Sequence, residues 1–325
     1  MILIYSTLID PSTNCVIDWL NFYNKTWYRV NIKEDLVQKE MLLKINDHGL
    51  NQDFTLNNQK LNINEIESVW FRRTPSNSLI SFISRIPEDL KDVLNKNAQS
   101  ELSSLNEYIF FTLKNKYSLG NSRIFNLNKL AQLEIAMKFG VKIPQTIVTN
   151  NKADLLNFYK KNKKIIIKPI QNSLYNSFNG KTFSTYTEVL KKSSINGLNS
   201  IFKPCLVQCN VEKKYEIRSF FISGKFYSMA IFSQSSHQTS IDFRKYNLKK
   251  PNRIVPYKLP KSLEIKLRLF MKYFQLNTGS FDLIYTSQGE YVFLELNPVG
   301  QFGMVSYPCN YNLEKQIAKN LIRKK

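Results

Sequence analysis

Apolar and polar residues alternate along the first part of the chain in the way expected of strands and helices. The run MILIYST at residues 1–7 is typical of a buried strand, and residues 27–32 repeat it after a helical stretch at 17–22. Residues 40–72 hold short strand-like runs (MLLKIN, DFTLNN, SVWFRR), and residues 87–117 have the spacing of an amphipathic helix. This part of the chain therefore predicts an α/β unit with a helical end.

The middle of the chain predicts a second unit in which helices and strands again alternate. LNKLAQLEIAMKFG has the pattern of a helix that ends at Gly140, and KADLLNFYKKN predicts another helix after an extended segment. The strand KKIIIKPI follows at residues 163–170, and QNSLYNSFNGK at 171–181 is expected to be a loop. A short strand and a helix over TEVLKKSS complete the unit.

The last third of the chain predicts two β-hairpins. Residues 216–232 turn at Ser223-Gly224, and residues 279–298 turn near Gln288-Gly289. A strand (LVQCNV) precedes the first hairpin, a helix at 263–274 separates the two, and a helix over NLEKQIAKNLI closes the chain.

Length and composition narrow the class of protein. The 325 residues are enough for a large core, and the hydrophobic fraction of 43% is ordinary for a folded soluble protein. No run approaches the roughly 18 apolar residues of a membrane span, and the first residues lack the basic region of a signal peptide. We expect a cytoplasmic protein with no membrane partner, whose cysteines are reduced thiols (Cys15, Cys205, Cys209 and Cys309).

The net charge of +21 favours an anionic partner, such as nucleic acid, an acidic peptide or a nucleotide. The alternative is that a chain rich in Lys, Asn and Ile is basic through codon bias, with a diffuse charge. The lysines are spread along the chain, and no nucleic-acid-binding motif accompanies them. We therefore do not expect nucleic acid as a partner.

The second hairpin carries three side chains with oxygen atoms that suit a metal ion. Glu295 and Asn297 lie two apart on a strand, so they point to the same face. Asp282 precedes Glu295 by 13 positions, about the separation that places the two side by side across the turn. Such oxygens suit Mg²⁺, which completes its shell with water and phosphate. The hairpin predicts a magnesium site for a nucleoside triphosphate; the alternative is a solvated strand end.

Four cations are candidates to bind the phosphates. Lys168 ends an apolar strand, so its stem would be buried and its ammonium free to emerge, and Lys129 lies in the first turn of a predicted helix. Arg218 and Arg244 belong to the EIR and DFR segments on or beside the last sheet. The plainer interpretation is that the lysines are solvated and the arginines pair with neighbouring acids, namely Asp242 or Glu216.

The base and ribose have candidates too. The strand LVQCNV offers backbone groups that can read an adenine edge, and Glu216 can accept hydrogen bonds from ribose hydroxyls. The ordered set of helix lysine, strand Lys-Pro, hinge strand, EIR, DFR, Asp and ELNP, over about residues 122–310, resembles the ATP-grasp superfamily. The resemblance implies an α/β (α+β) protein with the ATP-grasp fold. Its expected parts are an N-terminal α/β pre-ATP-grasp domain (1–121), a central lid-bearing subdomain (122–204) and a mainly antiparallel C-terminal subdomain (205–325), with ATP between the last two.

The resemblance also implies a role for each candidate residue. Expected ligands of ATP are Lys129 and Lys168 for the phosphates, Gln208, Cys209, Asn210 and Val211 for adenine, and Glu216 for ribose. Arg218 and Arg244 would meet phosphate or acyl phosphate, and Asp282, Glu295 and Asn297 would hold Mg²⁺. The hinge reads Gln208-Cys209, whereas Gln-Glu is common in the superfamily.

Within the superfamily, SVWFRRTP, YEIRSFFISGKFYSMAIFSQ, TSIDFRKYN and LELNPVGQFGMV look most like the graspetide (microviridin-type) synthetases, and NPVGQFGMVSYPCNYNLEKQIA is similar to the grasp-with-spasm maturases. This implies a ligase that activates Asp or Glu side chains of a ribosomal precursor peptide as acyl phosphates and links them to Ser/Thr hydroxyls or Lys amines. Implied partners are the leader and acidic core of the precursor, a SPASM-domain protein and a second copy in a homodimer.

Two other functions stay open. A ribosomal-protein-type glutamate ligase, which adds amino acids to a peptide C-terminus, shares DFR and E-x-N-P, and a non-catalytic nucleotide-binding partner is the third class. In the N-terminal unit, Arg72 and Arg73 are candidates to steer an anionic peptide. The alternative is that these arginines pair with Glu65 and Glu67.

Overall fold

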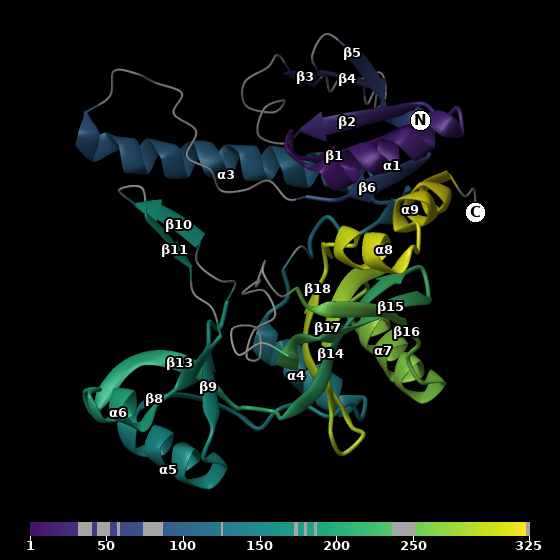
Figure 1. The fold of residues 1–325 in the computed structure, drawn as a ribbon. Coiled ribbons are helices and arrows are strands. Elements are labelled where there is room, and N and C mark those ends of the chain that lie inside the picture. Colours follow the sequence, from purple (N-terminus) through teal and green to yellow (C-terminus); the bar gives the residue numbers. More distant parts are fainter. Residues whose placement is uncertain are drawn as a thin grey trace. The chain divides into compact units, whose positions relative to one another are not determined.

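The computed structural model describes residues 1–31, 41–43, 53–56, 59–73, 87–124, 126–171, 175–178, 181–184, 187–235 and 251–322 (Figure 1). The chain forms two compact units, one of residues 1–125 with 312–325 and one of residues 126–311. The three-domain division from the sequence is finer and stays a prediction. The segment 312–325, expected in the C-terminal subdomain, groups by its contacts with the first unit.

The first unit is built on a four-stranded sheet in the order β2-β1-β6-β7, with each neighbouring pair parallel. Its strands are β1 (Ile2–Ser6), β2 (Trp27–Asn31), β6 (Ser68–Phe71) and β7 (Tyr117–Leu119). Every residue of β1 is buried, as expected for an inner parallel strand covered on both faces. A smaller antiparallel sheet consists of β3 (Met41–Leu43), β4 (Asp53–Leu56) and β5 (Gln59–Asn62), followed by η1 (Ile63–Glu65).

The α-helices among the described residues of the first unit are α1 (Pro11–Phe22), α3 (Glu88–Thr112) and α9 (Leu313–Ile322). Ile109 of α3 joins the core cluster around Leu3 and Tyr5 of β1. The terminal helix α9 packs against α1, and Ser68 Oγ donates a hydrogen bond of 2.7 Å to the carbonyl of Leu321. These contacts explain why the end of the chain completes the unit formed by its beginning.

The described residues of the second unit form two larger antiparallel sheets and one two-stranded sheet. The first has the order β12-β9-β13-β8, and the second has the order β16-β15-β14-β17-β18. The strands of the first are β8 (Thr146–Asn151), β9 (Ile165–Lys168), β12 (Glu188–Leu190) and β13 (Ile201–Cys209). The strands of the second are β14 (Lys213–Ile222), β15 (Lys225–Phe232), β16 (Arg253–Tyr257), β17 (Thr278–Thr286) and β18 (Tyr291–Asn297).

Helices cover or connect these sheets: α4 (Lys129–Lys138), α5 (Lys152–Asn162), α6 (Lys192–Asn196), η2 (Ser233–Ser235), α7 (Lys261–Tyr273) and α8 (Gly303–Cys309). A separate hairpin joins β10 (Tyr175–Phe178) to β11 (Lys181–Ser184). The ring of Phe270 in α7 lies 5.7 Å from Phe281 and 5.3 Å from Phe293 between ring centroids. Because side chains alternate along a strand, Asp282 points to the opposite face of the second sheet.

Both hairpins predicted from the sequence are confirmed. β14 and β15 join at Ser223-Gly224, where both residues have positive φ, and β17 and β18 join through a turn that contains Gly289 at φ 81°. Among the described residues, no helix has the length and hydropathy of a membrane span. All four cysteines are free thiols.

Three local predictions are wrong. The expected helix over TEVLKKSS begins as strand β12, because Val189 and Leu190 pair with Ile166 and Ile165 of β9, and the helix starts only at Lys192. The expected loop at 171–181 contains strand β10. The helix expected up to residue 117 ends at Thr112, after which β7 adds a strand to the parallel sheet. For β12 and β7, pairing with a strand distant in sequence outweighs the local pattern, whereas β10 pairs with its neighbour β11.

Candidate functional site

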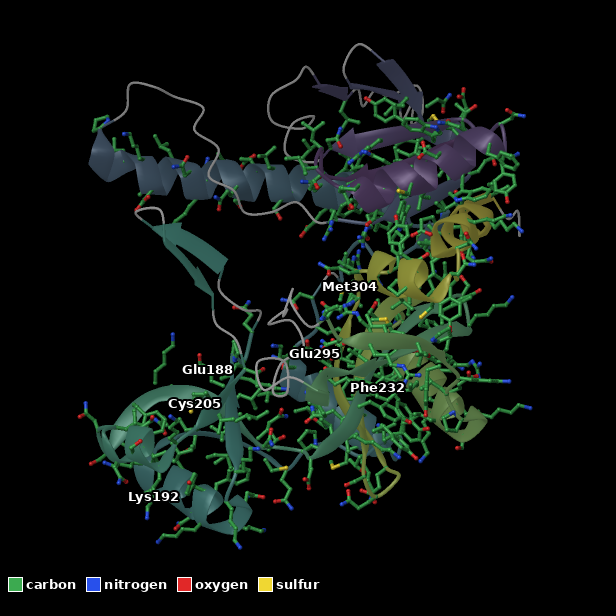
Figure 2. All side chains as sticks on the ribbon, viewed as in Figure 1. Glu188, Lys192, Cys205, Phe232, Glu295 and Met304 are labelled. Carbon is green, nitrogen blue, oxygen red and sulfur yellow. The ribbon has the colours of Figure 1, made fainter. Side chains whose placement is uncertain are left out.

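Charged residues on neighbouring strands form a row across the second sheet. Arg218 of β14 pairs in register with Asp282 of β17, and Asp282 pairs with Glu295 of β18. Directly paired residues share a face of the sheet, so the predicted approach of Asp282 and Glu295 is confirmed. Arg218 Nη1 lies 3.3 Å from Asp282 Oδ1. Figure 2 shows Glu295 on the second sheet, toward the side where β9 of the first sheet lies.

A β-bulge makes this pairing possible. From the turn inward, Tyr285 pairs with Tyr291 and Leu283 with Phe293, so a regular ladder would place Leu294 opposite Asp282. The register shifts there, and Glu295 takes that place with Leu294 as the extra residue. Without the shift, Glu295 would pair with Phe281 and point toward the face that α7 covers.

Helix α4 brings Lys129 to the row. The side chain of Asn128 caps the helix by accepting hydrogen bonds from the backbone N–H groups of Leu130 and Ala131. Lys129 Nζ lies 3.6 Å from Glu295 Oε2 and donates a hydrogen bond of 3.4 Å to the carbonyl of Pro169. The capped first turn thus holds an ammonium group beside the proposed metal carboxylate.

Gln132, which was not predicted from the sequence, connects α4 to β18, the strand that carries Glu295. Its Oε1 accepts a hydrogen bond of 2.6 Å from the backbone N–H of Leu296, and its Nε2 donates to the carbonyl of Leu127. The residue is buried, and it lies one turn after Lys129 on the same helix face. The spacing of three positions from Lys129 is the sequence signal that could have indicated a role for Gln132. The local sequence does not, however, predict a hydrogen bond to a residue 164 positions away.

Replacing Gln132 by methionine should therefore destabilise the second unit. The substitution keeps the length of the side chain but leaves the buried N–H of Leu296 without its acceptor, which costs about 1–3 kcal/mol. Urea unfolding followed by far-UV circular dichroism measures this. Met137→Leu, an exposed apolar change on the same helix, is the control, and equal stabilities of the two variants would contradict the assignment.

Most of the predicted site residues line one pocket of the second unit. They come from α4, β9, the hinge after β13, and strands β14, β17 and β18; the members are Lys129, Lys168, Cys209, Asn210, Val211, Glu216, Arg218, Asp282 and Glu295. Apolar residues also line the pocket, among them Pro144, Ile166, Ile231, Ile284 and Leu294. The lining is therefore about equally polar and apolar, with charged groups of both signs gathered in one concavity, which suits a charged small molecule.

The hinge has fewer open backbone groups than the sequence analysis assumed. The N–H of Cys209 donates to the carbonyl of Gln145, and the N–H of Asn210 donates to that of Lys164, both at 2.9 Å. Gln208 is buried, its amide donates to Thr146, and it is not part of the pocket lining. Within the described part of the chain, the N–H of Val211 makes no backbone hydrogen bond, so this hinge position could donate one to a base.

Glu216 lies in the pocket with partners of its own. Its carboxylate forms an ion pair with Lys213 and accepts a hydrogen bond of 2.8 Å from Ser233 Oγ. Lys213 also lines the pocket and had no signal in the sequence beyond its place three positions before Glu216 of the EIR segment. A ribose hydroxyl would join this group rather than meet an isolated carboxylate.

The remaining predicted residues lie elsewhere. Asn297 is exposed and pairs in register with Ser280, and it is not part of the pocket lining. Gly300, at φ 56°, turns the chain back so closely that a Cβ there would lie 3.0 Å from Ser280 Oγ. Arg244 lies outside the described residues.

The donor set fits Mg²⁺. Within the described ranges, no three His, Cys, Asp or Glu residues form a group that could hold a metal. Asp282 and Glu295 are nevertheless a pair of carboxylates on adjacent strands, and Asn297 adds an amide oxygen one register pair further along. Two hard oxygen ligands with water and phosphate are a usual arrangement for Mg²⁺.

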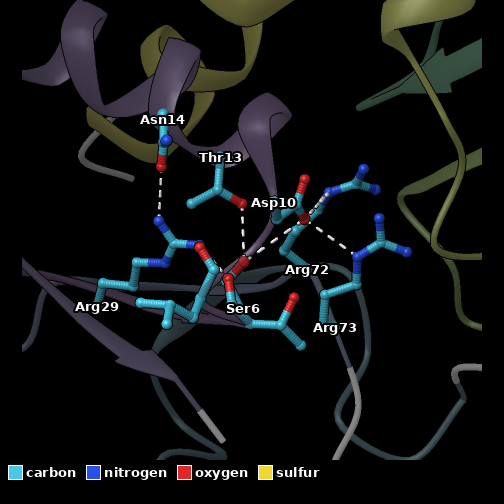
Figure 3. A network of polar contacts seen from close by, with 9 residues as sticks. Ser6, Asp10, Thr13, Asn14, Arg29, Arg72 and Arg73 are labelled. Atoms are coloured by element: carbon cyan, nitrogen blue, oxygen red, sulfur yellow. Dashed lines mark hydrogen bonds and ion pairs between the residues drawn. The ribbon is translucent and has the colours of Figure 1, made fainter. Parts of the chain in front are cut away.

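In the first unit, Arg72 and Arg73 do not pair with Glu65 or Glu67. Their Nε atoms lie 3.2 and 3.0 Å from Oδ2 of Asp10 (Figure 3), whereas Glu67 pairs with the N-terminal ammonium group. The interpretation that these arginines pair with nearby acids named the wrong acids, because the partner, Asp10, directly precedes helix α1 and lies 62 positions away from Arg72.

Comparison with known proteins defines the class. A scan against protein-family models gave no match, and neither did a search of curated proteins. The three-dimensional structure, in contrast, is similar to solved ATP-grasp ligases, and the chain has the ATP-grasp fold that the sequence predicted.

Three of these solved structures illustrate the likeness. A RiPP-associated ATP-grasp ligase from Chryseobacterium gregarium, in complex with ADP and a leader and core peptide, matches with a TM-score of 0.83, 25% identity, and coverage of 98% of this chain and 94% of that chain. The macrocyclase MdnC from Microcystis aeruginosa, bound with precursor peptide MdnA, matches with a TM-score of 0.80, 25% identity and 99% coverage of both chains. The ATP-grasp ligase PsnB, complexed with minimal precursor, Mg and ADP, has a TM-score of 0.74, 99% and 96% coverage, and 17% identity, so it supports the fold alone.

Proposed function

We propose that this chain is an ATP-dependent peptide maturase of the graspetide type. The observation that carries the proposal is the row of Arg218, Asp282 and Glu295 in one pocket with Lys129 and Lys168. Cations for phosphate and carboxylates for Mg²⁺ are the parts that phosphoryl transfer requires. The likeness to the Chryseobacterium gregarium and Microcystis aeruginosa ligases supports a peptide substrate.

The pocket would bind ATP through residues of both sheets. Lys129 and Lys168 would meet the phosphates, the N–H of Val211 would donate to the adenine edge, and Glu216 would accept from ribose. Asp282, Glu295 and Asn297 would hold Mg²⁺, which supplies charge neutralisation at the phosphoryl oxygens when bound. The ion pairs that Lys129 and Arg218 make with Glu295 and Asp282 keep both carboxylates turned toward the pocket.

The reaction would proceed in two displacements. A side-chain carboxylate of the peptide attacks the γ-phosphorus of ATP, so an acyl phosphate forms and ADP leaves. A Ser or Thr hydroxyl, or a Lys amine, then attacks the acyl carbon and loses a proton to solvent; the bond to phosphate breaks, phosphate leaves, and an ester or amide link remains. Arg218 and Arg244 would stabilise negative charge on the phosphoryl and acyl phosphate groups, and positioning would supply most of the acceleration.

Mass spectrometry after co-expression with an acidic precursor peptide tests the proposal. Each link formed by the maturase removes one water from the peptide. A gain of one amino-acid residue mass would instead favour the glutamate-ligase alternative, and an unchanged mass with no ATP hydrolysis would favour a non-catalytic nucleotide-binding protein. Turnover that persists after removal of the leader would contradict leader recognition.

Lys168→Ala should weaken nucleotide binding. Removal of one charged hydrogen-bond donor to phosphate is expected to raise the Kd for ADP about ten- to a hundredfold, with the fold intact. Isothermal titration calorimetry measures the Kd. Lys164→Ala is the control, because Lys164 precedes the same strand with an exposed side chain; an equal effect of both variants would contradict a specific role.

We also propose that the enzyme works as a homodimer and together with a SPASM-domain protein, as the resemblance of the sequence implies. Light scattering coupled to gel filtration tests the first statement, and co-purification with the SPASM-domain protein tests the second.

A further inference from the structure

One edge of the first unit gathers polar residues that the proposed ATP chemistry does not use. At the carboxyl ends of the parallel strands, β1 ends at Ser6 and β6 ends at Phe71. The chain leaves β1 through α1 toward β2 on one side, whereas it leaves β6 through α3 toward β7 on the other. The strand order therefore reverses between β1 and β6, and ligands of open parallel sheets bind outside the carboxyl ends at such a point.

A buried carboxylate holds two arginines at this edge. Asp10 Oδ2 lies 3.2 Å from Nε of Arg72 and 3.0 Å from Nε of Arg73. On its other side, Ser6 Oγ lies 3.5 Å from Asp10 and 2.9 Å from Thr13 Oγ1 (Figure 3). Backbone bonds from both arginines to the carbonyl of Tyr5 fix where their side chains begin.

The two arginines differ in their access to solvent. The side chain of Arg72 is 2% exposed, whereas that of Arg73 is 35% exposed. Figure 3 shows the terminal nitrogens of both guanidinium groups on the side of Asp10 away from Ser6 and Thr13. Among the residues that the structure describes, Asp10 is the polar partner of the Arg73 side chain, and it uses Nε. The orientation of the two Nη atoms of Arg73 is therefore fixed, and both atoms stay accessible to a ligand from solvent.

Among the described residues, the charges at this edge are unequal. Two guanidinium groups face one carboxylate, and each repels the other. Burial lowers the pKa of Arg72 to about 10; the charge of Asp10 opposes this fall and that of Arg73 adds to it. Arg72 stays protonated at neutral pH, so an anion that meets the exposed guanidinium would offset an excess of positive charge.

We propose that Arg73 is the contact residue of a carboxylate-binding subsite at this edge, with an Asp or Glu side chain of the peptide substrate as its ligand. The guanidinium fork matches a carboxylate in two parallel hydrogen bonds, which an ammonium group does not reproduce. This inference rests on the proposed function, because that function supplies an acidic peptide as the substrate.

The test titrates the full-length protein with two synthetic probes, acetyl-Gly-Glu-Gly-Glu-Gly-amide and its Gln counterpart, followed by NMR of the arginine Nε–H signals. The wild type should bind the Glu peptide more tightly than the Gln peptide and shift the Arg73 signal. Arg73→Gln should lower the affinity for the Glu peptide about tenfold or more and remove the discrimination. Arg123→Gln, an exposed arginine of the same unit, should change neither.

Further variants and probes separate this subsite from a general attraction of anions to a basic protein. Arg73→Lys keeps the charge without the fork and should restore only part of the affinity. Equal binding of both peptides by the wild type, retained discrimination in Arg73→Gln, or tighter binding of inorganic phosphate than of the Glu peptide would each overturn the proposal. ADP titration of the same variants should give unchanged Kd values. If the wild type fails to bind ADP, the proposed function is contradicted, whereas the comparison of the Glu and Gln peptides still tests the role of Arg73.

Discussion

Replacement of Glu295 by glutamine is expected to lower ATP-dependent turnover by about two to three orders of magnitude. Glutamine keeps the size of the side chain and one oxygen, but it removes the charge that Mg²⁺ requires next to Asp282. It also removes the partner of Lys129, whose ammonium lies 3.6 Å from Glu295. Because the side chain lies on the pocket face of β18, the core beneath it should be unaffected.

The measurements are steady-state turnover and Mg²⁺ binding in the presence of ADP, the second of which does not depend on catalysis. Asn297→Ala should also weaken Mg²⁺ binding. Glu290→Gln is the matched control: it lies in the same hairpin, but its carboxylate pairs with Lys142 away from the row. Full turnover or unchanged Mg²⁺ binding in Glu295→Gln would refute the metal assignment.

Replacement of Asp10 by asparagine is expected to destabilise the first unit by about 3 kcal/mol. The substitution leaves Arg72 charged, buried and without its carboxylate, and loss of one partner of a buried ion pair costs much more than loss of a surface pair. All three tryptophans (Trp19, Trp27 and Trp70) belong to this unit, so urea unfolding followed by tryptophan fluorescence reports on it.

Glu67→Gln supplies the contrast. Glu67 pairs with the N-terminal ammonium group at 3.6 Å, and its side chain is 55% exposed, so the change should cost less than about 1 kcal/mol. Similar losses in Asp10→Asn and Glu67→Gln would contradict a buried network that holds the sheet edge together.

The contribution of Asp10 should depend on pH. Burial raises the pKa of the Asp10 carboxyl, but the charges of Arg72 and Arg73 outweigh it and hold the pKa below its ordinary value. A carboxyl whose pKa is lower in the folded state stabilises the fold above the unfolded pKa of about 3.9, and loses this contribution as the pH falls through the folded value. The difference in stability between wild type and Asp10→Asn should therefore shrink as the pH falls below about 4.

Much of the candidate site follows from local sequence rules. Glycine and serine in left-handed conformations mark the hairpin turns, and alternation along a strand places Glu295 and Asn297 on one face. The apolar run before Lys168 and the predicted helix that begins near Lys129 likewise fix where each lysine side chain starts. These features depend on neighbours in the chain, so the sequence predicts them.

Contacts over long separations could not be predicted in this way. Three features depend on which distant segments meet. They are strand β12 in place of the helix expected over TEVLKKSS, the ion pair of Arg72 with Asp10, and the hydrogen bond between Gln132 and the N–H of Leu296. A local pattern contains no information about a partner that is tens of residues away, and burial of apolar and charged groups at such contacts outweighs local preference.

The row of Arg218, Asp282 and Glu295 in the second unit shows most clearly what the sequence predicts and what only the tertiary structure decides. The sequence by itself determined which residues carry the oxygens, that Glu295 and Asn297 share a face, and that a hairpin folds Asp282 toward them. The separation of 13 positions also predicted that Asp282 and Glu295 lie side by side, but only the tertiary structure showed that a shift at Leu294 produces this pairing while Gln132 binds the backbone of Leu296. A one-residue shift changes the face of every side chain beyond it, so only the packed hairpin could place both carboxylates in the same pocket.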